Sequence, residues 1–289
     1  MSLVDLQGAF DLHIHSHPSL FTRTGDDLDM ANHAAQSGLA GILIKSHFES
    51  TVGRAYLADK VVEGVRVFGG LALNHFAGGI NPAAVENALK LGAKQIWMPT
   101  VDARAHEVVY GHTGGFGYQE SGSRVVRPSI TIFNDDGQLT DDAKAVVELV
   151  RDHNAILGTA HLCWDEILAL TKFAHEIKFG KLLVTHPYFD PPLLTVPQQK
   201  ELTDLGATLE LCGGNLYPIP GTARLEYYNQ TVTEIGAASI ILTSDAGQPR
   251  KSLPAEVLRV FAQCLLETGI SQSEINVMTK ENPARLLGL

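Results

Sequence analysis

The stretch FDLHIH, residues 10–15, is the most informative part of this 289-residue chain. Side chains two positions apart on a β-strand point to the same side, so His13 and His15 would project together while Leu12 and Ile14 face the other way. Two neutral imidazoles at the end of a strand supply about half of the ligands of a four- or five-coordinate cation site. The stretch therefore predicts a strand that ends in a pair of metal ligands.

Seven further apolar runs rich in β-branched residues follow, and residues with helical periodicity separate each run from the next. This alternation is typical of repeated βα units that form a parallel sheet. A (β/α)8 barrel, the TIM-type fold, needs about 250 residues, so the chain has room for one barrel and one insertion. We therefore predict an α/β protein in which residues 1–289 form a single barrel domain. The predicted strand segments are 10–15, 41–47, 65–74, 95–100, 155–161, 182–186, 208–212 and 240–245.

The insertion falls between the fourth and fifth segments, at about residues 102–130. Residues 110–118 read YGHTGGFGY, which has too many glycines and too little apolar periodicity for a helix. Loops that follow strands lie at the C-terminal mouth of such a barrel, where long loops usually carry function. We expect this segment to be a lid or a wall that faces the substrate, and a surface excursion is the alternative.

Three later segments also end in side chains that bind metals. The fifth ends at His161, the sixth at His186 and the eighth at Asp245. The carboxyl ends of all strands meet at one mouth of a parallel barrel, so these groups would converge on His13 and His15. A buried carboxylate without a partner is unfavourable, and a cation shared by all five residues removes that difficulty. Alternatively, Asp245 caps the following helix and the two histidines are polar rim residues.

The order of these residues resembles the metal-ligand pattern of the amidohydrolase superfamily of metal-dependent hydrolases. The ending ENPARLLGL, residues 281–289, is similar to the C-terminal Asn-Pro-Ala helix of many of those enzymes. The stretches 44–47 and 161–162 are similar to a group of amidohydrolase-related proteins of undefined activity. The resemblance covers essentially the whole barrel and implies one or two divalent cations. Imidazole and carboxylate ligands suit zinc, our first expectation, and also manganese and iron.

One position departs from that pattern. Binuclear members of the superfamily often bridge two metals with a carboxylated lysine at the end of strand four, where this chain has WMPT at residues 97–100. Lys45 and His47, two apart at the end of the second segment, could instead take part in a second site or bind an anionic group of the substrate. A structural ion pair is the alternative for Lys45. Glu210 points into the barrel from the seventh segment and would need a partner there, either Lys45 or the metal.

These residues predict metal-assisted hydrolysis of a C–N or C–O bond in a small molecule. A cation held by imidazoles and a carboxylate acidifies water, to a pKa of about 7 for zinc, and so provides a nucleophile at neutral pH. The resemblance implies that Asp245 takes the proton of this water and delivers it to the leaving group. His186 or the metal would polarise the scissile bond. Arg23, Arg104 and Arg124 in predicted loops could bind a substrate carboxylate, with solvated surface arginine as the alternative for each.

Three other functions remain open. Residues 11–16, DLHIHS, also resemble the opening motif of polymerase-and-histidinol-phosphatase (PHP) type phosphoesterases, in which His47 would be a ligand. Those enzymes end in Asp-x-His, whereas Gly247 follows Asp245 at that spacing here. A single-metal, non-oxidative decarboxylase is the second alternative, and a metal-binding scaffold without catalysis is the third. An enzyme is favoured over the scaffold because Asp245 and the His-x-His pair are both present.

The composition argues against several other classes. The 22 Lys and Arg against 32 Asp and Glu give a formal net charge of −10, which opposes binding to nucleic-acid phosphates. Three cysteines without paired spacing fit a reducing compartment, so we expect a cytoplasmic protein without disulfides. We expect neither a signal segment nor a membrane anchor. The predicted partners are a small-molecule substrate and, by family habit, further copies of the chain in a homo-oligomer.

Overall fold

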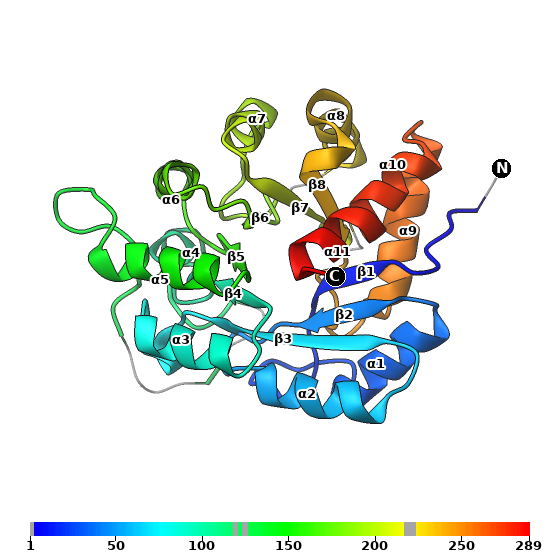
Figure 1. The fold of residues 1–289 in the computed structure, drawn as a ribbon, viewed down its shortest axis with the longest axis horizontal. Helices are drawn as coiled ribbons and strands as arrows, with labels where there is room; N and C mark the ends of the chain where they lie inside the picture. The colour runs from blue at the N-terminus through cyan, green and yellow to red at the C-terminus, as the bar shows by residue number, and fades with distance from the viewer. Residues whose placement is uncertain (1–2, 118–120, 123–126, 217–223) are drawn as a thin grey trace.

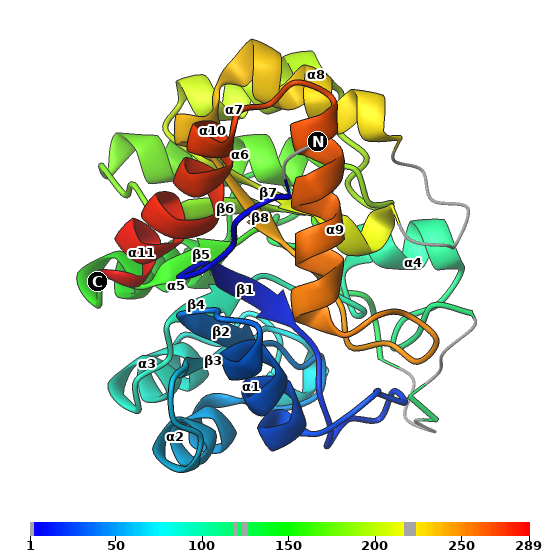
Figure 2. The same cartoon turned by 90° about the vertical axis from the view of Figure 1, so that its right-hand side faces the viewer.

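The structure, a computed structural model, describes residues 3–117, 121–122, 127–216 and 224–289. Eight parallel strands follow one another in the order β1 to β8 and form a nearly closed barrel with helices around it (Figures 1 and 2). This confirms the predicted (β/α)8 fold. The strands are β1 (Phe10–Ile14), β2 (Gly41–Ile44), β3 (Arg66–Ala72), β4 (Gln95–Trp97), β5 (Ile156–Gly158), β6 (Leu182–Thr185), β7 (Thr208–Cys212) and β8 (Ile240–Thr243). The helices are α1 (Asp27–Gln36), α2 (Val52–Val61), α3 (Pro82–Lys90), α4 (Arg104–Tyr110), α5 (Asp141–Asp152), α6 (Trp164–Glu176), α7 (Val196–Asp204), α8 (Leu225–Ile235), α9 (Pro254–Glu267), α10 (Gln272–Asn276) and α11 (Asn282–Leu287).

Side-chain caps and apolar faces explain where the helices form. The Asn81 side chain accepts from the backbone N–H groups of Ala83 and Ala84, and Pro82 occupies the first position of α3. Asparagine at the cap and proline at the first helical position both favour a helix start. α5 buries an apolar stripe at helical spacing, which packs the helix against the barrel. That stripe is Ala143, Val146, Val147 and Val150.

The barrel closes where its first and last strands meet. The backbone N–H of His15 donates to the carbonyl oxygen of Ala246 at 2.7 Å, and that of Asp245 donates to the carbonyl of His13 at 2.9 Å. β1 and β8 consequently lie side by side (Figure 2). This closure matters for function, because it places the two histidines of β1 next to the aspartate that follows β8.

Several strands end before the polar residues that the sequence suggested would finish them. β6 ends at Thr185 and β8 at Thr243, so His186 and Asp245 lie one and two residues beyond their strands. Their φ angles are 32° and 46°, in the left-handed region that residues other than glycine rarely adopt. Strained backbone of this kind is concentrated at functional sites.

The insertion after β4 lies where the sequence predicts it, but its first part is helical. α4 runs to Tyr110, and Gly111 ends it with a left-handed φ of 79°. Residues 111–117 are irregular, as expected. Part of the predicted lid, including Arg124, lies outside the described residues. None of the helices in the described ranges combines the length and apolar character needed to span a membrane.

Candidate metal centre

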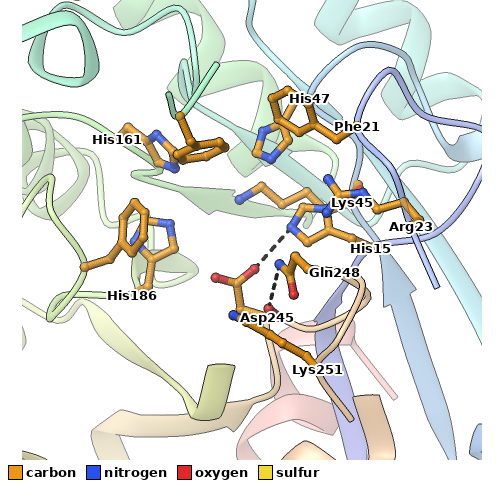
Figure 3. Close-up of a pocket in the computed structure, with 12 residues that line it drawn as sticks. His15, Phe21, Arg23, Lys45, His47, His161, His186, Asp245, Gln248 and Lys251 are labelled. Carbon is orange, nitrogen blue, oxygen red and sulfur yellow. Dashed lines mark hydrogen bonds and ion pairs between the residues drawn. The ribbon is translucent and has the colours of Figure 1, made fainter. Parts of the chain in front are cut away.

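Three of the five predicted ligands meet at the junction of β1 and β8. His13 Nε2 lies 3.2 Å from Asp245 Oδ1, and His15 Nε2 lies 3.1 Å from the same oxygen. Figure 3 shows the His15 contact at the wall of a cavity. The ligand atoms of all three residues lie within 4.8 Å of one another. The two histidines are buried, whereas 15% of the Asp245 side chain is exposed, so the group is reached from the barrel mouth.

Hydrogen bonds on the far side of each ring fix the positions of the histidine protons. His13 Nδ1 lies 2.9 Å from Glu210 Oε1, and His15 Nδ1 lies 3.0 Å from the Lys45 carbonyl oxygen. A carbonyl or carboxylate oxygen accepts, so Nδ1 of each ring carries a hydrogen and donates it. Burial holds the pKa of His15 well below its usual value, which keeps that ring neutral.

Asp245 is ionised beside these two rings. Burial opposes its ionisation, but His13, His15 and His186 outweigh burial and hold the pKa of the carboxyl well below its usual range. Two imidazole nitrogens and a carboxylate oxygen therefore lie within 4.8 Å of one another, an arrangement that a cation would stabilise. Imidazole nitrogen and carboxylate oxygen are ligands of zinc and related metals, and a carboxylate behind a ligating histidine is a common outer partner.

Glu210 lies behind His13, at Nδ1, whereas Lys45 contacts Nε2, the nitrogen that faces Asp245, so the two residues contact different nitrogens of one ring. Glu210 Oε1 accepts from His13 Nδ1 and from Thr243 Oγ1, the latter at 3.1 Å. Lys45 Nζ lies 3.1 Å from His13 Nε2, and its side chain points into the space between His161 and His186 (Figure 3). Burial lowers the pKa of Lys45, although nearby carboxylates oppose this effect.

The other two predicted ligands, His161 and His186, face His15 and Asp245 across the cavity (Figure 3). The rings of His161 and His186 are 5.1 Å apart between centroids, and His186 is 6.0 Å from the ring of His13. Burial lowers the pKa of both, to about 3 for His186, so both rings are neutral. The structure thus places four of the five residues on the cavity wall, His15 and Asp245 on one side and His161 and His186 on the other, and His13 lies buried beside Asp245. His161 and His186 can serve the same cation or a second one.

The cavity itself has a volume of about 50 Å³. This is enough for a few water molecules or for one small functional group of a larger ligand. Several wall residues come from loops and not from the ends of strands. They are Phe21, Arg23, Phe116, Phe189, Gln248 and Lys251. Of the arginines considered from the sequence, Arg23 lines the cavity, whereas Arg104 is exposed to solvent.

His47 connects this cavity with a larger neighbour. Its ring stacks on that of His15 at a centroid distance of 5.1 Å, and its Nδ1 lies 2.8 Å from Thr100 Oγ1. Burial holds the pKa of His47 well below its usual value. The second cavity measures about 660 Å³ and is lined in part by residues 111–114 of the glycine-rich segment. The segment therefore borders a cavity that shares His47 with the candidate site, and its role as a lid stays a prediction.

One buried histidine was not identified from the sequence. His106, on α4, has its Nδ1 3.0 Å from that of His161. No strand-end position or His-x-His spacing marks it, because it lies on a short helix within the insertion.

Comparisons with known proteins agree with this architecture. A family of unknown function (DUF6282) matches residues 8–210. No curated protein matches the sequence. An amidohydrolase from Pseudomonas aeruginosa is 12% identical with a TM-score of 0.62, over 96% of this chain and 95% of its own.

Two further solved structures are similar to the same extent. The probable dipeptidase PvdM from Pseudomonas aeruginosa is 12% identical with a TM-score of 0.63, over 97% of this chain and 94% of its own. An amidohydrolase from Burkholderia multivorans is 12% identical with a TM-score of 0.58, over 97% and 99%. At 12% identity these similarities concern the fold alone. The fold confirms the resemblance to the amidohydrolase superfamily.

Proposed function

The chain belongs to the family of unknown function DUF6282, and we propose that it is a metal-dependent hydrolase that cleaves a C–N or C–O bond of a small molecule. One observation carries the proposal: His13 Nε2 and His15 Nε2 lie 3.2 and 3.1 Å from the same carboxylate oxygen, Asp245 Oδ1. The fold supports it, because solved structures that share this barrel include amidohydrolases and a probable dipeptidase.

Residues on the two walls of the cavity would have different roles in hydrolysis. A bound divalent cation supplies Lewis acidity and lowers the pKa of water, to about 7 for zinc. His13, His15 and Asp245 would hold it, with His161 and His186 available opposite. Asp245 is ionised and partly exposed to the cavity, so it accepts a proton from water there and returns it to the leaving group. The neutral ring of His186 is placed to stabilise charge that develops on the substrate oxygen.

The cavity wall indicates an anionic substrate. Arg23, Lys45 and Lys251 all line the cavity, and Lys251 Nζ also donates to the carbonyl of Gly214 at 3.0 Å. Cationic side chains around a small space favour a carboxylate or similar group close to the scissile bond. The volume of about 50 Å³ admits the reacting group, and the rest of the substrate would extend toward the larger cavity beyond His47.

Phosphoester hydrolysis is the second candidate. The position of His47 on the cavity wall favours it, because a PHP-type enzyme would use a histidine from strand two as a ligand. The same cationic wall would suit a phosphate.

Metal analysis followed by a substrate screen tests the proposal. Protein purified without chelator should contain about one or two equivalents of zinc, manganese or iron by mass spectrometry. With that metal supplied, it should hydrolyse an anionic amide, ester or lactone faster than a phosphomonoester or phosphodiester. Protein that retains no metal and binds none when zinc, manganese or iron is added would contradict the proposal. Metal binding without turnover would favour a scaffold, and release of CO2 would favour the decarboxylase.

A further inference from the structure

We propose that His106 is a positioning residue that sets the tautomer of His161 and links the glycine-rich segment after β4 to the cation site. The inference rests on the proposed function, because it assigns His161 the role of a metal ligand. It concerns a residue that contacts neither the tight ligand group nor the cavity directly.

His106 lies between the insertion and the ligand. The side chain is fully buried. Its Nε2 is 2.6 Å from the carbonyl oxygen of Gly115, and its Nδ1 is 3.0 Å from His161 Nδ1. The two rings stack with a centroid distance of 5.1 Å and an angle of 20° between their planes, and His106 also stacks on Tyr110 at 4.4 Å. These hydrogen bonds and ring contacts, together with a contact to the Phe116 ring at 4.9 Å, hold His106 in one orientation.

The hydrogen bonds determine which nitrogen of His161 is free. A carbonyl oxygen only accepts, so His106 Nε2 carries the hydrogen and donates to Gly115. A neutral imidazole has one N–H, so His106 Nδ1 is an acceptor. The hydrogen between the two Nδ1 atoms therefore belongs to His161. His161 is left with its lone pair on Nε2, the nitrogen that a cation requires.

Removing the acceptor would leave His161 free to carry its hydrogen on Nε2. Cation binding would then have to shift the hydrogen to the other nitrogen, which weakens affinity.

The same hydrogen bonds couple the segment to the site. The backbone N–H of Gly114 donates to the carbonyl of Val101 at 2.8 Å, which anchors the residue before Gly115. The residue after it, Phe116, lines the cavity with its ring 6.0 Å from that of His161. Gly115 and Phe116 are adjacent in the chain, so the segment that lines the cavity also supplies the carbonyl that fixes His106.

Two substitutions separate the hydrogen bond from simple packing. His106→Phe keeps an aromatic ring but removes the acceptor, whereas His106→Asn keeps an acceptor oxygen near the position of Nδ1. We expect His106→Phe to lower zinc affinity by about 10- to 100-fold, the usual effect of losing an outer partner of a ligand, and His106→Asn to stay within about fivefold of wild type. Competition with a chromophoric chelator measures both. His175→Phe, at an exposed position on α6, is the matched control and should bind zinc like wild type.

Nitrogen-15 NMR of the metal-free protein gives a readout that packing alone would not change. In wild type, His161 should show hydrogen on Nδ1, and in His106→Phe it should shift toward Nε2. Hydrogen on Nε2 of wild-type His161 would overturn the inference, even if His106→Phe does not fold. Equal losses of zinc affinity in the two His106 variants, or no loss in His106→Phe, would also overturn it. Failure of wild type to bind zinc would refute the proposed function, while the tautomer would still decide the role of His106.

Discussion

Replacing Asp245 with asparagine should remove the stabilisation of this protein by zinc while leaving the fold intact. Asparagine matches aspartate in shape and tolerates the left-handed φ of 46° at this position. The substitution removes the charged oxygen that lies within 3.2 Å of both His13 Nε2 and His15 Nε2. It therefore removes one of the three members of the tight ligand group and adds no steric demand.

The expected size of the effect follows from linkage between binding and unfolding. Zinc at 100 times its Kd adds about 2.7 kcal/mol to the free energy of unfolding. At about 2–4 °C per kcal/mol, this raises the Tm of wild type by about 5–10 °C. Loss of a direct ligand should weaken binding by at least about 100-fold, because outer partners alone are worth 10- to 100-fold. At the same zinc concentration the variant then gains only about 0.4 kcal/mol, or about 1 °C.

Thermal unfolding with EDTA or with zinc, at pH 8 where unperturbed imidazoles are neutral, measures this difference directly. Asp152→Asn, at an exposed position near the end of α5, is the matched control and should respond to zinc like wild type. Hydrolysis of any substrate found should fall by about 100- to 10,000-fold in Asp245→Asn, because the proton acceptor is lost as well. If zinc raises the Tm of Asp245→Asn as much as that of wild type, Asp245 is not a ligand and the reasoning fails.

Two further substitutions test the surroundings of the ligands. A Cβ on Gly247, where φ is 124°, would lie 1.9 Å from the carbonyl oxygen of His15, so Gly247→Ala should lower the free energy of unfolding by about 3 kcal/mol or more. Gly180→Ala, where a Cβ meets nothing within 4 Å, is its control in urea unfolding, and equal effects would contradict the argument. Glu210→Gln keeps an acceptor for His13 but loses the charge, so zinc affinity should fall by about tenfold in a chelator competition; an unchanged Kd would remove Glu210 from this role.

The sequence was sufficient to predict the barrel and the residues around its mouth, because both signals are local. Apolar runs that alternate with helical segments predict the strands. Because all strands of a parallel barrel end at the same mouth, a histidine or aspartate at the end of a run is predicted to lie there. Strand boundaries were less predictable. His186 and Asp245 turn into left-handed backbone just after their strands, and this change leaves no mark in an apolar pattern.

The division of the ligands into groups of three and two depends on closure between β1 and β8, which local patterns do not specify. His106 could not be recognised for a related reason. It lies 55 positions before His161 in the sequence, and only the packing of the insertion against the mouth brings the two rings together. The loop residues of the cavity wall, such as Phe116 and Lys251, are placed by the same kind of packing.

The hydrogen-bonded junction between β1 and β8 imposes an order on maturation. Because His15 and Asp245 are separated by 230 positions, a nascent polypeptide lacks the complete tight cluster until the codon for Asp245 has been translated. On the proposed function, a cation bound there would link positions 15 and 245 and disfavour opening of the barrel between β1 and β8. Metal loading would then be completed only after residue 245 has joined the chain.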